Sequence, residues 1–176
     1  MERRSAIKQM MIIAGGVAIL PSCSDDPGKA SIALKNLPVT ADQEALLAAI
    51  AETIIPKNDM PGARDMNLHL FTLKMVDDCS DAAEQQAFIG GLDSIDRLAK
   101  QKYRNAFVQC SDTQKAELLN DIAGGRQDNT QLTTMMNITK RRVIQGFMNS
   151  KYVMTDLKKY ELVPGRYNGY FPVKTS

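Results

Sequence analysis

Apolar residues recur every three or four positions through most of the chain between Thr40 and Phe147. This spacing places them on one face of a helix. No stretch alternates between apolar and polar residues for long enough to predict a strand. The pattern therefore predicts an all-α fold: a compact single-domain bundle of about five helices.

The first helix has clear signals at both ends. Thr40 and Gln43 have the spacing of a capping box, in which each side chain binds a free backbone amide of the first turn. Pro56 disfavours helical geometry in the residue before it, so the helix should end near Ile55. Two prolines with Asn58, Asp59 and Gly62 then predict a loop from Pro56 to Ala63.

Two further helices are predicted before residue 104. The first spans Arg64 to Asp78, and its apolar face is formed by Leu68, Phe71, Met75 and Cys79. The next begins at Asp81 and Glu84, and its stripe consists of Phe88, Leu92, Ile95 and Ala99. Gly90 and Gly91 interrupt this stripe at a cost of ~1 kcal/mol each relative to alanine. They predict a kink, a break or a close approach of another helix.

The last two helices precede a different kind of segment. Ser111 and Gln114 predict a second capping box, and Gly124-Gly125 ends the helix that follows it. The final stripe consists of Leu132, Met136, Thr139, Val143 and Phe147. From Asn149 onward aromatic residues, proline and glycine predict an irregular tail. Its tyrosines either cover the helical body or contact a partner.

The first 23 residues have the composition of an export signal. Arg3 and Arg4 precede an uncharged stretch from Met10 to Leu20, which is shorter than the ~20 apolar residues of a membrane span. The paired arginines resemble a twin-arginine signal, and the alternative is an ordinary secretory signal that contains two arginines.

Residues 20–23, Leu-Pro-Ser-Cys, resemble a lipobox, in which the cysteine carries the lipid; the alternative is a chance cysteine near a cleavage site. We therefore expect residues 1–22 to be a signal peptide, 23–39 a tether lipidated at Cys23, and 40–176 the helical domain. The expected location is the periplasm or cell envelope, anchored to a membrane by lipid.

The charge balance gives no sign of a nucleic-acid partner. The chain has 22 basic and 20 acidic residues, and removing Arg3, Arg4, Lys8 and Glu2 with the signal leaves 19 of each sign. No nucleic-acid-binding motif is present either, so nucleic acid is not an expected partner.

The sequence contains no recognisable catalytic constellation. His69 is the only histidine, no glycine-rich nucleotide loop is present, and Asp77-Asp78 is the kind of acidic pair common on solvated helix faces. We expect no catalytic residue, no metal and no cofactor on this chain. Cys79 and Cys110 either form a disulfide or are two separate buried thiols.

Several segments in a fixed order resemble the gluconate 2-dehydrogenase subunit 3 family, the small subunit of membrane-associated, FAD-dependent sugar dehydrogenase complexes. The resemblance covers roughly residues 40–170. The matching segments are Ile54-Ile55-Pro56, Asp59, Pro61-Gly62-Ala63, Gly91-Leu92, Phe107, Gln114, Leu118-Leu119, Phe147–Ser150, Leu157, Tyr160, Pro164-Gly165, Tyr167 and Gly169.

This resemblance implies a non-catalytic subunit that binds a flavoprotein of the glucose-methanol-choline oxidoreductase type and supports its twin-arginine export and maturation. FAD is then bound by the partner, which oxidises the sugar or sugar acid, and electrons pass to a cytochrome c subunit. The candidate partner-interface residues are Pro56, Pro61, Gly62, Tyr160, Pro164, Gly165 and Tyr167.

Two other hypotheses stay open at this stage. The chain could be a free-standing envelope lipoprotein that binds a ligand or acts as a scaffold. An independent enzyme is the weaker hypothesis, because the chemistry it requires was not found in the sequence.

Overall fold

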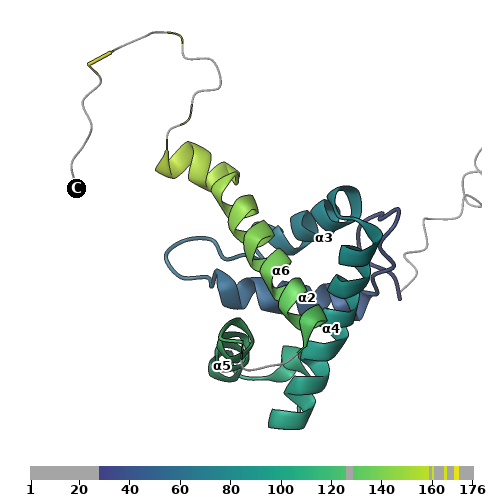
Figure 1. Ribbon diagram of the computed structural model, residues 1–176. Coiled ribbons are helices and arrows are strands. Elements are labelled where there is room, and N and C mark those ends of the chain that lie inside the picture. The colour runs from purple at the N-terminus through teal and green to yellow at the C-terminus, as the bar shows by residue number, and fades with distance from the viewer. Residues whose placement is uncertain (1–27, 126–128, 159, 161–164, 166–168, 171–176) are drawn as a thin grey trace, which may run out of the picture.

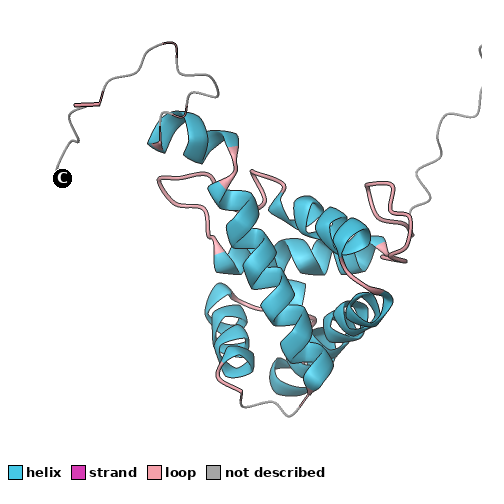
Figure 2. Ribbon diagram, turned by 45° about the horizontal axis from the view of Figure 1, so that its top comes forward, coloured by secondary structure: helices cyan, strands magenta, loops and turns pink. Residues whose placement is uncertain are grey.

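The computed structural model describes residues 28–125, 129–158, 160, 165, 169 and 170. These residues form five α-helices and two short helical segments, and no strand occurs among them, which confirms the predicted all-α fold (Figure 2). The elements are α2 (Ala41–Ile54), α3 (Leu68–Cys79), α4 (Ala82–Tyr103), the 3-10 turn η1 (Phe107–Gln109), α5 (Asp112–Ala123), α6 (Thr130–Met148) and the π-helix η2 (Tyr152–Leu157). The predicted signal peptide, with Arg3, Arg4 and Cys23, lies outside the described residues.

Helix α6 crosses the whole bundle and packs most extensively on α4 and α3 (Figure 1). Its buried face includes Leu132, Met135 and Val143, which are fully excluded from solvent. The main core combines Leu132 and Met135 with the stripe of α4, and with Leu47 and Ile50 of α2. None of the described helices is both long enough and apolar enough to cross a membrane.

The helix boundaries follow local hydrogen bonding. Both predicted capping boxes are present: Thr40 Oγ1 accepts from the Gln43 N–H and Ser111 Oγ from the Gln114 N–H. The side chain of Asp81 caps α4 by accepting from the Glu84 N–H at 2.8 Å. Helix α2 ends at Ile54, directly before the residue that precedes Pro56.

The glycine pair in α4 marks the closest approach of two helices. Helix α4 continues without a break through Gly90 and Gly91. A Cβ atom on Gly91 would lie 2.3 Å from Met135 Cβ and 2.8 Å from the backbone oxygen of Gln131, both on α6. The sequence predicted a kink, a break or a close approach of another helix at this glycine pair, and the structure shows the close approach.

Helix α3 differs from its prediction at its start and in its buried face. It begins at Leu68 rather than Arg64, because Asn67 adopts a left-handed conformation (φ 52°) and residues 62–67 form turns. Cys79 and Asp78 are exposed, whereas Thr72 and Asp77 are buried. Helix α3 contacts neighbours on more than one side, so a single stripe did not predict its buried face.

The segment after α6 also differs in part from the prediction. Residues Tyr152–Leu157 form a π-helix rather than irregular chain, with the Lys158 N–H donating to the Val153 carbonyl at 2.9 Å. Val153 is buried and fixes this turn against the body.

The two glycines of α4 provide a matched pair for testing the helix approach. Gly91→Ala should lower the free energy of unfolding by about 1–3 kcal/mol, because the new methyl group meets the backbone of α6. At Gly90 a methyl group meets only the end of the flexible Gln131 side chain, so Gly90→Ala should be neutral or gain up to ~1 kcal/mol. Urea unfolding followed by circular dichroism measures both. Equal stability of the two variants would contradict this account.

Candidate functional site

One end of the molecule brings together two segments that are distant in sequence. The loop after α2 and the C-terminal end of α6 share a small apolar cluster separate from the main core. Ala51, Ala63, Leu68 and Val143 are its buried members, and Phe147 packs against them. Both segments carry residues of the family resemblance, so this end of the molecule is the candidate functional site.

The loop is shaped by the half-buried carboxylate of Glu52. Its oxygens accept from the N–H groups of Lys57 (3.0 Å) and Arg64 (2.9 Å), which tie the two ends of the loop to α2. Gly62 lies against this carboxylate: a Cβ atom there would be 2.5 Å from Glu52 Oε1. Glycine is therefore needed at position 62 for the carboxylate to reach both amides.

An ion pair adds to the loop. Lys57 Nζ lies 3.0 Å from Asp65 Oδ2. The Lys57 ammonium and the Gly62 N–H together hold the pKa of Asp65 below its usual value. Both side chains are well exposed, so this pair contributes little to stability.

A groove of about 390 Å³ lies between this loop, α3 and the end of α6. Its walls are Asp65, Met66, Leu68, Phe71, Gly146, Asn149, Ser150, Lys151 and Tyr152. Gly146 lets α3 approach α6, since a Cβ atom there would lie 2.8 Å from Phe71 Cδ1. The groove combines apolar walls with polar groups at its rim, which is a usual composition for a binding surface.

The candidate interface residues differ in their exposure to solvent. Pro56 is exposed at the start of the loop, Pro61 is half-buried, and Gly62 is buried. Tyr160 and Gly165 are exposed, whereas Pro164 and Tyr167 lie outside the described residues. Gly62 thus shapes the loop from within, while Pro56 and Tyr160 are accessible to a partner.

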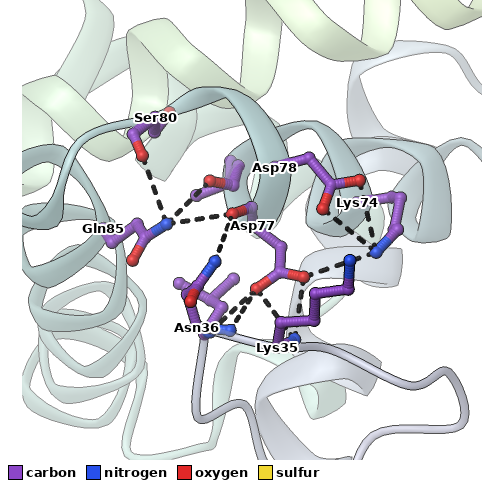
Figure 3. A network of polar contacts seen from close by, with 9 residues as sticks. Lys35, Asn36, Lys74, Asp77, Asp78, Ser80 and Gln85 are labelled. Carbon is purple, nitrogen blue, oxygen red and sulfur yellow. Dashed lines mark hydrogen bonds and ion pairs between the residues drawn. The ribbon is translucent and has the colours of Figure 1, made fainter.

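On the other side of the molecule, Asp77 holds the segment that leads into α2. This buried carboxylate accepts from the N–H groups of Lys35, Asn36 and Leu37 at 2.7–3.1 Å (Figure 3). The side chain of Asn36 donates back to the Asp77 carbonyl at 3.2 Å. Asp77 was expected on a solvated face, and that expectation is wrong: the carboxylate is buried in a nest of backbone amides.

These contacts determine the charge state of Asp77. Burial raises the pKa of the carboxyl, but the hydrogen bonds from Lys35, Asn36, Leu37 and Lys74 outweigh it, so the pKa lies below the usual 3.8. Lys74 lies 3.4 Å from Asp77 and 3.3 Å from Asp78, and it is the only described ammonium paired with either. Asp77 is therefore ionised at neutral pH and serves as a structural anchor.

The segment anchored by Asp77 is a closed loop. The Ala41 N–H donates to the Gly28 carbonyl (3.2 Å) and the Ala30 N–H to the Val39 carbonyl (3.3 Å). Leu37 and Val39 are buried in the main core. The described end of the predicted tether thus has a defined position beside the start of α2.

His69 and the two cysteines do not form a reactive group with other described residues. Burial lowers the pKa of His69, and its Nδ1 atom has no hydrogen-bond partner among the described residues. Cys79 is an exposed free thiol at the end of α3, while Cys110 is a buried free thiol whose Sγ contacts the Ala106 carbonyl at 3.5 Å. The structure thus has two separate thiols of unequal burial. In the described part of the chain, no three His, Cys, Asp or Glu residues could hold a metal ion together.

Sequence reasoning missed the two carboxylates that organise the loops, Glu52 and Asp77. No local pattern marks them, because their partners are backbone amides up to 42 positions away. The exposed apolar residues Ile144 and Met148 were missed as well, because their spacing of four places them on one face of α6 but does not tell whether another helix covers that face.

The sequence matches the family described as gluconate 2-dehydrogenase subunit 3 over residues 41–165. This region begins at the first residue of α2 and includes all five α-helices and η2. No curated protein and no solved structure matches the chain.

The Asp77 anchor predicts a pH-dependent stability. Because its pKa is depressed in the folded state, its contribution is complete above about pH 4 and is lost as the pH falls through the folded pKa. Asp77→Asn should lower the free energy of unfolding at pH 7 by about 2–3 kcal/mol, since the buried amides lose a charged acceptor.

Urea unfolding between pH 7 and pH 2 measures this effect. The difference in the free energy of unfolding between the wild type and Asp77→Asn should become smaller below pH 4. Asp78→Asn is the matched control, because its side chain is 43% exposed and receives no loop amides. If this difference in free energy does not change with pH, the stabilising role of the ionised Asp77 carboxylate is contradicted.

Proposed function

Because the chain belongs to the gluconate 2-dehydrogenase subunit 3 family, we propose that it is the non-catalytic small subunit of a membrane-associated dehydrogenase. Its partner in this proposal is a flavoprotein of the glucose-methanol-choline oxidoreductase type, which binds FAD and oxidises a sugar or sugar acid. The family match over residues 41–165 carries the proposal, since it covers the whole described helical body.

The proposed role of the helical body is to hold the flavoprotein. The loop from Pro56 to Ala63 and the end of α6 support this role, because segments that resemble the family from both ends of the domain meet there. Electrons from the flavin pass to a cytochrome c subunit in this proposal, and the present chain takes no part in that transfer.

The second part of the proposal concerns export. The paired residues Arg3 and Arg4 support twin-arginine export, a route that carries folded cargo. A flavoprotein that has already folded around FAD and lacks its own signal could cross the membrane bound to this chain. The small subunit then acts as an escort as well as a structural subunit.

The third part concerns attachment to the membrane. Cys23 follows Leu20-Pro21-Ser22 and would carry the lipid after removal of residues 1–22. Each buried methylene of an acyl chain contributes ~0.8 kcal/mol, so several chains on one cysteine suffice for stable anchoring. The complex would then be held at a membrane surface in the periplasm or cell envelope.

The export proposal predicts that Arg3→Lys with Arg4→Lys leaves both subunits in the cytoplasm, because the flavoprotein is exported only while it is bound to this chain. Cell fractionation, with blotting for this chain and flavin fluorescence for the partner, measures the result. Changing Lys8→Arg is the control, since it keeps the charge and leaves the arginine pair intact. Normal export of the flavoprotein with the double lysine variant would exclude co-export.

The anchoring proposal predicts that Cys23→Ser moves the subunit from the membrane to the soluble envelope fraction. Export should still occur, because the arginine pair is unchanged. Mass spectrometry of the wild-type N-terminus should detect acyl groups on Cys23. A wild-type chain that begins at another residue, or that carries no lipid, would contradict this part of the proposal.

A further inference from the structure

The C-terminal half of α6 exposes an apolar stripe on its outer side. Ile144 and Met148 are 43% and 42% exposed, and residues four apart on a helix are neighbours on its surface. The exposed apolar surface continues in sequence with Leu157 (55%) and Tyr160 (53%). Four large apolar side chains are thus exposed to solvent within 17 residues. Such exposure is energetically unfavourable and is uncommon in a small domain unless a partner covers the side chains.

Cations border this stripe. Lys140 and Arg141 lie four and three positions before Ile144 on α6 and are exposed beside it, and Lys151, three positions after Met148, is exposed just beyond the end of the helix. Helix α6 contains no acidic residue, and the first one after it is Asp156. None of these three cations forms an ion pair with a residue in the described part of the chain. Carboxylates of a partner could pair with all three.

The surface next to the stripe is also shaped for contact. Lys151 and Tyr152 line the groove of about 390 Å³ between α6 and α3. The π-helix that follows, Tyr152–Leu157, is a rare structure that occurs frequently at functional sites. The stripe and its cations therefore form the exposed surface at the end of α6, and the groove begins next to it in sequence, at Lys151 and Tyr152.

We propose that this surface of α6 is the docking face for the dehydrogenase subunit, and that the matching patch on that subunit combines apolar side chains with carboxylates. The inference rests on the proposed function for the existence of the partner. Electrostatic complementarity would orient the two subunits and speed their encounter, while burial of Ile144 and Met148 would provide affinity.

The position of the tether favours a protein rather than a lipid surface as the occupant. The loop that begins at Gly28 and the end of α6 lie on opposite sides of the molecule (Figures 1 and 2). If Cys23 carries a lipid, the short segment to Gly28 keeps that side of the domain near the membrane. The end of α6 then lies on the side of the domain away from the membrane, where a soluble subunit can bind.

The test uses the affinity-tagged full chain expressed with the dehydrogenase subunit from the same organism. Ile144→Asp with Met148→Asp should reduce the co-purified flavoprotein at least about tenfold, because both side chains leave the interface. Val108→Asp is the matched control: Val108 is 41% exposed, but it lies on η1 beside a different groove. Flavin absorbance of the eluate measures the partner, and circular dichroism verifies that each variant is folded.

A charge variant provides a second measurement that does not depend on the apolar positions. Lys140→Glu with Arg141→Glu should weaken association and reverse its response to salt. For the wild type, added salt should lower the association rate, because it screens the attraction between opposite charges. Unchanged binding and unchanged salt response in this variant would contradict an acidic partner patch.

The outcomes separate this inference from the proposed function. If the wild type retains no flavoprotein, the proposed function fails and the inference fails with it. If the wild type and both double variants retain it equally, the function stands and the docking face is wrong. Loss of the flavoprotein with Val108→Asp alone would place the interface near η1 instead.

Other occupants give a different result. If Ile144→Asp with Met148→Asp abolishes flotation with anionic vesicles or self-association, while flavoprotein binding persists, the occupant is a membrane or a second copy of the chain.

Discussion

The structure depends on how closely α6 approaches its two neighbours. Glycine stands at both crossings: Gly91 of α4 faces Met135 of α6, and Gly146 of α6 faces Phe71 and Leu68 of α3. A methyl group at either crossing would meet atoms at less than 3 Å, so larger residues would force the helices apart. These contacts hold α6 between α3 and α4, with its inner face buried. Its outer face is left free for contact with another molecule.

Two carboxylates then fix the loops around this bundle. Glu52 accepts amides from both ends of the loop after α2, and Asp77 accepts three consecutive amides of the segment before α2. In each case one side chain replaces the regular hydrogen bonding that a loop lacks. In both places the carboxylate determines the conformation of a surface loop.

The arrangement also gives the domain two different sides. Asp77 positions the segment towards the N-terminus on one side, and the loop after α2 meets the end of α6 on the other. A subunit proposed to connect a membrane anchor with a soluble flavoprotein needs such a separation. Helix α3 connects the two sides, because Asp77 near its end binds the segment before α2 and Leu68 at its start belongs to the apolar cluster at the end of α6.

The sequence by itself determined the helices, their caps and the family. These features depend on neighbours within a few residues, such as Thr40 with Gln43, or on segments in a fixed order. The sequence also indicated a special role for Gly91, but it did not distinguish a kink from a close helix approach, because that difference depends on the position of α6. Only the tertiary structure decided that Asp77 is buried, that Gly62 makes room for Glu52, and that Ile144 and Met148 remain exposed. Each of these depends on contacts between segments far apart in sequence, and periodicity along a single helix contains no information about them.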